Sequence, residues 1–133
     1  MKKLLLAFFI VTASFCNAQN YMDYSQKEII NALSLKGESY DFDYTKDGTK
    51  YLYVTDRIFN TYKYYYFDDN NRCFTYMVIY GKADYSILIE LLDKNYTRSG
   101  SRWYDENCTA TLEYNSELKS YVTTFVRKQK IKD

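Results

Sequence analysis

Residues Thr61 to Tyr80 read TYKYYYFDDNNRCFTYMVIY, two runs of aromatic and β-branched residues on either side of an Asp-Asp-Asn-Asn cluster. Tyrosine, phenylalanine, valine, isoleucine and threonine favour the half-buried surface of a β-strand. Aspartate and asparagine tolerate the positive φ angles that a tight reversal of the chain requires. This segment is therefore predicted to form a long β-hairpin with its turn at Asp68 to Asn71.

Both faces of this hairpin are rich in aromatic and apolar side chains. Side chains alternate along a strand, so Tyr62, Tyr64 and Tyr66 share one face of the first arm, and Tyr76 belongs to the second arm. Tyrosine combines a large contact area with a polar tip and is enriched at binding surfaces. These four tyrosines are candidate binding residues. The alternative is that cross-strand tyrosine pairs simply stabilise an exposed sheet face.

Two helices are predicted, one before the hairpin and one after it. Ser25 and Glu28 have the spacing of a capping box, which starts a helix, and the apolar stripe that follows ends at Gly37. The second helix covers Asp84 to Tyr96, where apolar residues recur at helical spacing. Each helix therefore has one apolar side that can cover a sheet.

Five further strands are predicted from alternating or β-favouring residues. They cover residues 39–45, 51–55, 102–105, 108–114 and 119–127. Short links between strands favour antiparallel pairing. The predicted fold is α+β, a single antiparallel sheet of about seven strands with two helices packed on one face, in the order α-β-β-β-β-α-β-β-β.

The start of the chain, residues 1–18, is predicted to be a secretory signal peptide. A cationic Met-Lys-Lys precedes an apolar run, and Ala18 ends a small-residue cleavage site. The run is shorter than the roughly 20 apolar residues of a transmembrane anchor. A lipid anchor at Cys16 is disfavoured because Phe15 stands where the lipoprotein signal needs a small residue. We therefore expect an exported protein, periplasmic or secreted, with one α+β domain over residues 19–133.

This domain has a weak two-unit repeat, over residues 23–80 and 84–128. Each unit begins with Asp-Tyr-Ser, at Asp23 and at Asp84, and continues with a helix and antiparallel strands. Three matched residues are slender support for a duplication. The predicted order of elements rests on periodicity and does not depend on this match.

Composition and charge exclude several classes of function. Without Lys2 and Lys3 the predicted mature chain has 16 basic and 17 acidic side chains, so it has no basic field to attract nucleic acid. The chain contains no histidine, the commonest general base and zinc ligand. Residues 43–48 imitate half of a calcium loop, but Val54 stands where that loop needs glutamate, so a plain turn is favoured. We expect no metal and no cofactor.

Two cysteines and the single tryptophan have open alternatives. Cys73 and Cys108 remain after removal of the signal peptide, and an oxidising compartment allows a disulfide between them. The alternative is two buried free thiols on separate strands. Trp103 is a candidate for stacking a sugar or a peptide, with a position in the core as the alternative.

Three functions are compatible with these observations. The preferred one is an exported non-enzymatic module that binds an unknown protein, peptide or glycan through a tyrosine-rich sheet face. The second is a small carboxylate-dependent hydrolase or lyase using Asp105, Glu106 and Glu113, since carboxylates about 5–9.5 Å apart catalyse glycoside cleavage. The third is a structural envelope component whose aromatic face packs in an assembly.

Overall fold

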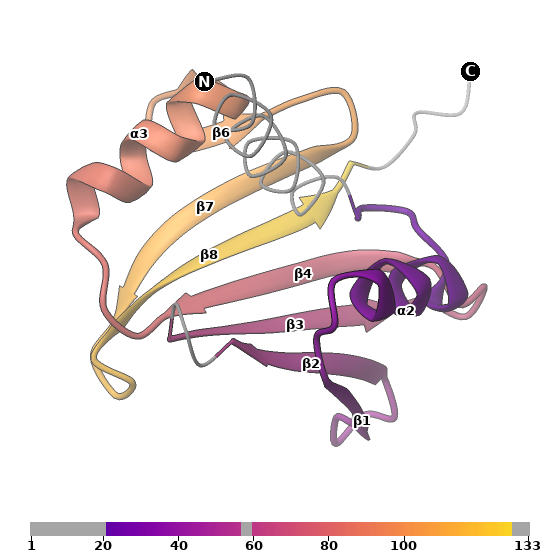
Figure 1. Ribbon diagram of the computed structural model, residues 1–133. Coiled ribbons are helices and arrows are strands. Elements are labelled where there is room, and N and C mark those ends of the chain that lie inside the picture. Colours follow the sequence, from indigo (N-terminus) through magenta and orange to yellow (C-terminus); the bar gives the residue numbers. More distant parts are fainter. Residues whose placement is uncertain (1–20, 57–59, 129–133) are drawn as a thin grey trace, which may run out of the picture.

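The protein is seen here as a computed structural model that describes residues 21–56 and 60–128. Within these ranges the chain forms two helices and one eight-stranded antiparallel sheet (Figure 1). The predicted signal peptide lies outside the described residues. The elements are α2 Gln26–Leu35, β1 Tyr40–Tyr44, β2 Lys50–Asp56, β3 Thr61–Phe67, β4 Cys73–Tyr80, α3 Tyr85–Asn95, β5 Thr97–Ser99, β6 Arg102–Tyr104, β7 Cys108–Asn115 and β8 Ser120–Arg127.

The strand order is β1-β2-β3-β4-β8-β7-β6-β5, so the last strands of the two halves of the chain pair with each other. At this central pairing Met77 of β4 lies opposite Thr124 of β8. The predicted sheet class and the predicted order of helix, strands, helix, strands are confirmed. The Asp-Tyr-Ser triplets, however, occupy different places: Asp84 is the N-cap of α3, whereas Asp23 lies two residues before the N-cap Ser25 of α2.

The sheet has one strand more than the sequence predicted. The additional strand is β5, Thr97–Ser99, which follows α3 directly and pairs with β6 so that Arg98 lies opposite Trp103. Gly100 has a φ of +63° and allows the tight reversal between β5 and β6. Thr97, Arg98 and Ser99 include no apolar or aromatic residue, unlike β6 with Trp103 and Tyr104, which is why the sequence predicted only a break after the helix.

The predicted central hairpin is present as β3 and β4. Its turn is fixed by Asp68, whose Oδ1 accepts hydrogen bonds from the backbone amides of Asn70 and Arg72 at 2.9 and 3.0 Å. Asn71 has a φ of +63° in this turn, a conformation that asparagine adopts more readily than most residues. The Asp-Asp-Asn-Asn cluster therefore closes the hairpin through its own side-chain chemistry.

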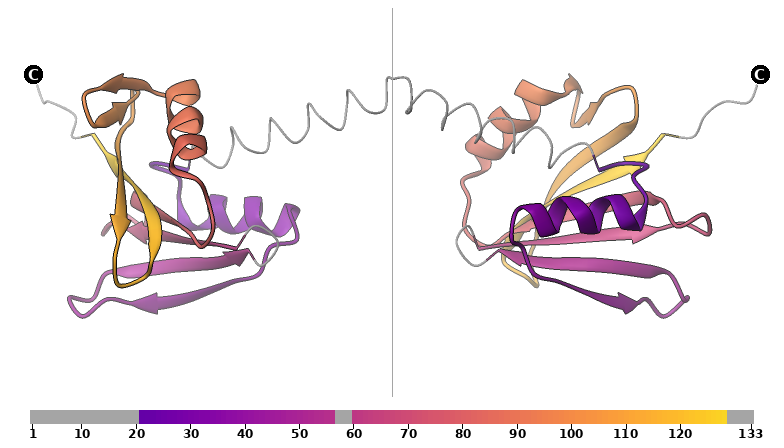
Figure 2. Two further views of the ribbon diagram at one scale, coloured as in Figure 1. Left: turned by 90° about the vertical axis from the view of Figure 1, so that its left-hand side faces the viewer. Right: turned by 45° about the vertical axis from the view of Figure 1, so that its right-hand side comes forward.

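Both helices lie on the same face of the sheet, and the sheet curls around them (Figure 2). Helix α2 buries Ile29 and Leu33 against it, and α3 buries Leu88 and Leu92. A row of buried side chains crosses the sheet on this side, one from each neighbouring strand from β2 to β6. Its members are Leu52, Tyr65, Tyr76, Phe125, Ala110 and Trp103. No helix in the described ranges has the length and apolar character needed to cross a membrane.

Replacing Ser25 by alanine is expected to lower the free energy of unfolding by about 1 kcal/mol. The Ser25 hydroxyl accepts a hydrogen bond from the Glu28 amide at 3.2 Å, so the substitution leaves an amide of the first helical turn without its partner. Urea denaturation measures the change. Ser25→Asp retains a side-chain acceptor and is expected to remain close to the unaltered protein. Equal midpoints for Ser25→Ala and the unaltered protein would show that the cap is energetically silent.

Candidate functional site

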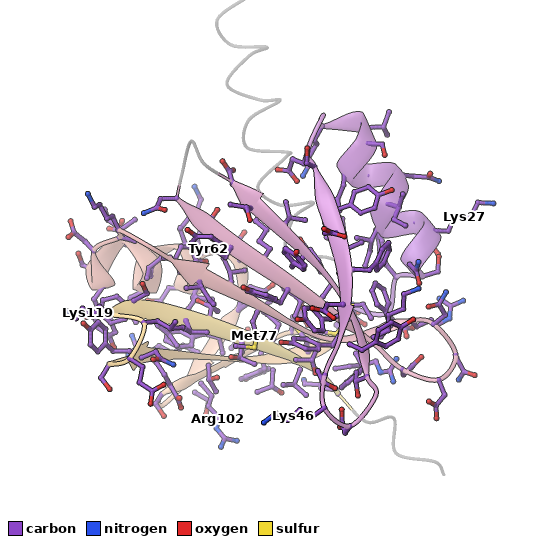
Figure 3. All side chains as sticks on the ribbon, turned by 90° about the horizontal axis from the view of Figure 1, so that it is seen from below. Lys27, Lys46, Tyr62, Met77, Arg102 and Lys119 are labelled. Carbon is purple, nitrogen blue, oxygen red and sulfur yellow. The ribbon has the colours of Figure 1, made fainter. Side chains whose placement is uncertain are left out.

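The outer face of the sheet, which points away from α2 and α3, carries a group of tyrosines on β2 and β3. We call this group the tyrosine face; it consists of Tyr51, Tyr53, Tyr62, Tyr64 and Tyr66. The residues that alternate with them on β2, Leu52 and Val54, are buried beneath the helices. Figure 3 views the sheet from below and shows Arg102, another residue of the outer face, extending away from the side where Lys27 of α2 lies. Strand alternation thus separates the tyrosines from the core.

Four of these tyrosines touch one another across the two strands. The register sets Tyr53 opposite Tyr64 and Tyr51 opposite Tyr66. The ring centroids are 6.1 Å apart in the first pair, which is stacked, and 5.4 Å apart in the second. The Tyr51 ring also contacts Tyr53 at 6.2 Å and Tyr64 at 6.0 Å, which joins both pairs. These four side chains are half-buried and form a contiguous aromatic surface in contact with solvent, and Tyr62 is exposed on the same face of β3.

Two carboxylates of the edge strand β1 stand beside the tyrosines. Asp41 lies opposite Tyr53 and Asp43 lies opposite Tyr51, so both project onto the outer face. The Tyr53 hydroxyl donates a hydrogen bond to Asp41 Oδ2 at 3.5 Å. The Oδ1 atom of each aspartate accepts a hydrogen bond from the next backbone amide, that of Phe42 at 2.9 Å and that of Tyr44 at 2.8 Å. The two carboxylates therefore also accept hydrogen bonds from backbone amides of β1.

Nearby carboxylates and loss of hydration raise the pKa values of three phenols of the tyrosine face. The Asp41 carboxylate raises the pKa of Tyr53 above its ordinary value, because a second negative charge beside it is unfavourable. The pKa of Tyr51 is raised by loss of hydration and then by Asp43. Loss of hydration also raises the pKa of Tyr66. Tyrosine hydroxyls are protonated at neutral pH, and these upward shifts extend that state to higher pH, so the hydroxyls are able to donate hydrogen bonds to a ligand.

Only part of the predicted binding set lies on this surface. Tyr62, Tyr64 and Tyr66 belong to the tyrosine face, but Tyr76 and Trp103 are in the core, with 1% and 2% of their surface exposed. Tyr76 stacks on Phe125 with ring centroids 4.3 Å apart. The indole Nε1 of Trp103 donates a hydrogen bond to a carboxylate of α3 at 2.8 Å. Both side chains point to the helix side of the sheet, so neither is available to a partner at the outer face.

Sequence reasoning missed Tyr51 and Tyr53 as members of the site. Their alternation with Leu52 and Val54 was visible, and it indicated a strand with one buried face. The sequence did not reveal that β2 lies beside β3, in a register that brings its tyrosines against those of the central hairpin. That pairing is a property of the assembled sheet.

Cys73 and Cys108 are free thiols, and both are buried. Cys73 belongs to β4 and Cys108 to β7, and β8 lies between these strands. Two strand spacings amount to about 10 Å, which exceeds the separation of about 7 Å between Cα atoms that a disulfide bridges. Burial raises the pKa of each thiol to about 12, so both are protonated and unreactive at neutral pH.

Glu113 lies far from the other two carboxylates considered for hydrolysis, Asp105 and Glu106. Asp105 Oδ1 accepts hydrogen bonds from the backbone amides of Asn107 and Cys108, at 2.7 and 2.8 Å, and so shapes the turn before β7. Glu113 lies five residues beyond Cys108 on the same strand, about 17 Å further along. Asp105 and Glu106 line an open depression of about 610 Å³. The distance to Glu113 exceeds the separation that paired-carboxylate catalysis requires.

The calcium-like segment at residues 43–48 covers the end of β1 and most of the turn that connects β1 to β2. Asp47 Oδ1 accepts hydrogen bonds from the Thr45 hydroxyl and, at 3.3 Å, from the Thr49 amide. This carboxylate is therefore engaged within its own turn. In the part of the chain that the structure describes, no group of three or more histidine, cysteine, aspartate or glutamate side chains is placed to hold a metal ion.

Among the described residues, the best candidate for a binding surface is thus the aromatic and acidic outer face of β1, β2 and β3. Its tyrosines are ordered by mutual contacts, and its carboxylates are fixed by hydrogen bonds to backbone amides and to Tyr53. Comparison with known proteins adds no further guide to function. No protein family, curated protein or solved structure matches this chain.

Proposed function

We propose that the protein is an exported, non-enzymatic module that binds a protein, peptide or glycan through the tyrosine face. The observation that carries this proposal is the contiguous set of tyrosine rings on the sheet face that neither helix covers. Tyrosine supplies a large contact area, a polar tip and a low entropic cost of ordering, the properties found at protein recognition surfaces.

The way the rings are held also favours binding. They project from two adjacent strands, and each ring of the Tyr53–Tyr64 pair is supported by the other. Side chains that are ordered before binding lose less conformational freedom when a partner arrives. The tyrosine face is therefore suited to bind a partner without rearrangement.

We expect Tyr53→Ser/Tyr64→Ser to abolish capture of a partner from the envelope and medium of the producing cell. The experiment uses immobilised protein without residues 1–18, and the captured material is identified by mass spectrometry and glycan analysis. The matched control is Tyr114→Ser, which removes a tyrosine that is 57% exposed on the helix side of the sheet. The control is expected to retain the partner.

Thermal denaturation followed by circular dichroism establishes that the double variant is folded. If the folded double variant captures the same partner as the control, the tyrosine face is structural and the proposed function is wrong. A different result would be that neither the unaltered protein nor the control captures a partner and that only the double variant loses self-association. That result would also contradict the proposed function and would assign the tyrosine face to assembly of the protein with itself.

A further inference from the structure

We propose that the tyrosine face binds an extended polypeptide segment that carries lysine or arginine at every second residue, with these cations placed between the tyrosine rings and Asp41 and Asp43. This inference rests on the proposed function and specifies the chemistry of its partner. It follows from four features of the outer face: its negative charge, its aromatic surface, the spacing of its two carboxylates and the hydrogen bonds already made by the amides of the edge strand β1.

The outer face of β1, β2 and β3 is negative and has no cation of its own. In the described residues neither Asp41 nor Asp43 forms an ion pair. The lysines of β2 and β3 face the helix side: Lys50 Nζ lies 4.6 Å from the centre of the Phe42 ring, and Lys63 is paired with Val54. The two carboxylates are therefore available to a cation that a partner supplies.

Aromatic rings next to carboxylates favour ammonium and guanidinium groups over neutral or anionic ones. The face of a tyrosine ring attracts a cation held within about 6 Å of its centre. Tyr51 and Tyr53 each lie directly opposite an aspartate, so a cation above either ring is also close to a negative charge. The Asp41 carboxylate raises the pKa of Tyr53, and loss of hydration followed by the Asp43 carboxylate raises that of Tyr51, which is consistent with a negative potential at the rings. An anionic ligand would be repelled by that negative potential.

The spacing of the charges matches an extended chain. Asp41 and Asp43 are two residues apart on one strand and share a face, which places equivalent atoms about 7 Å apart. Every second side chain of an extended peptide has the same spacing and points to one side. A peptide with cations at alternate residues therefore presents them in register with both aspartates, whereas a block of consecutive lysines directs half of its charges away.

The peptide is expected to lie over the face and not to extend the sheet at β1. The amides of Phe42 and Tyr44 already donate hydrogen bonds to the aspartates, so an added strand would have to displace both carboxylates. A second copy of β1 paired antiparallel about Phe42 would set Asp41 against Asp43 of the other copy. Like charges directly opposite one another destabilise strand pairing. A basic partner is thus favoured over a second copy of the same edge.

The test measures the binding of three fluorescent octapeptides by anisotropy at low salt. In these probes threonine alternates with lysine, with glutamine or with glutamate. The variant Asp41→Asn/Asp43→Asn removes both charges and keeps side-chain acceptors for the Phe42 and Tyr44 amides. The matched control is Glu90→Gln/Glu117→Gln, which removes two exposed charges away from the tyrosine face. Tyr53→Ser/Tyr64→Ser tests the aromatic contribution.

We expect the lysine peptide to bind the unaltered protein and the control variant Glu90→Gln/Glu117→Gln equally. We expect it to bind Asp41→Asn/Asp43→Asn about fivefold more weakly, or weaker still. Its affinity should fall with added salt, and the tyrosine variant should lose binding. Equal affinity of the lysine and glutamine peptides, or no effect of Asp41→Asn/Asp43→Asn, overturns the preference for a cation. In that case tyrosine-dependent binding of the neutral peptide would leave the proposed function intact. If none of the three peptides binds, the inference of a cationic partner is also overturned. The proposed function is then tested by the capture experiment alone.

Discussion

Trp103→Ala is expected to lower the free energy of unfolding by about 3–5 kcal/mol, the cost of removing a large buried aromatic side chain. The indole is 2% exposed and occupies the last position of the buried row that crosses the sheet. It joins β6 to α3 through the hydrogen bond from its Nε1 to Asp93. The substitution leaves a cavity between these elements and removes their direct polar link.

Two further variants separate the causes of this loss in urea denaturation. Trp103→Phe keeps most of the apolar volume but removes the donor to Asp93, so it is expected to lose less stability than Trp103→Ala. Tyr104→Ala changes the adjacent residue, which is 39% exposed on the outer face, and is expected to have a small effect. Losses of similar size for Trp103→Ala and Tyr104→Ala would contradict the position of the indole in the core.

Alkaline pH is expected to destabilise the protein steeply between about pH 9 and pH 12. Burial raises the pKa of Cys73 and of Cys108 to about 12, whereas a thiol in the unfolded chain titrates near its ordinary value of about 8.5. Over this interval the folded state holds protons that the unfolded state has lost. The resulting stabilisation is therefore complete below the unfolded pKa and is lost as the pH rises towards the folded pKa, at about 1 kcal/mol per pH unit for each thiol.

Urea denaturation under reducing conditions at several pH values measures this slope. Cys73→Ala/Cys108→Ala removes both thiols and is expected to flatten the slope, although its stability at neutral pH is also lower. A residual slope is expected because burial raises the pKa values of Tyr65 and Tyr76 well above their ordinary value. An identical slope with and without the thiols would show that they do not titrate in this interval.

Several features of the fold followed from local sequence. The capping box at Ser25 and Glu28 marked the start of α2, and the Asp-Asp-Asn-Asn cluster marked the turn at Asp68. Such signals are readable because the residues that make the contacts are neighbours in the chain. The short strand β5 was missed because it has no periodicity of its own. It is a strand only because it pairs with β6.

The site was predictable only in part. Tyr62, Tyr64 and Tyr66 were recognised as one face of a strand, since alternation is fixed by the backbone. Tyr76 and Trp103 belong to equally aromatic patterns, yet they lie in the core because their sides of β4 and β6 are the ones that the helices cover. Which face of a two-sided aromatic strand is buried depends on where the helices pack.

Local residue patterns predicted an α+β chain with antiparallel hairpins, two amphipathic helices and alternating tyrosines, because capping, turn formation and side-chain alternation are local properties. The Asp-Gly turn also predicted the β1–β2 hairpin, but only the assembled sheet shows that β2 pairs with β3 and which residues face each other in both pairings. Those registers bring Tyr51 and Tyr53 against Tyr64 and Tyr66 and set Asp41 and Asp43 beside them. The strand order also places β8 between Cys73 and Cys108. The reason is that strand partners and the covered face arise from contacts between residues far apart in the chain, which local residue patterns do not encode.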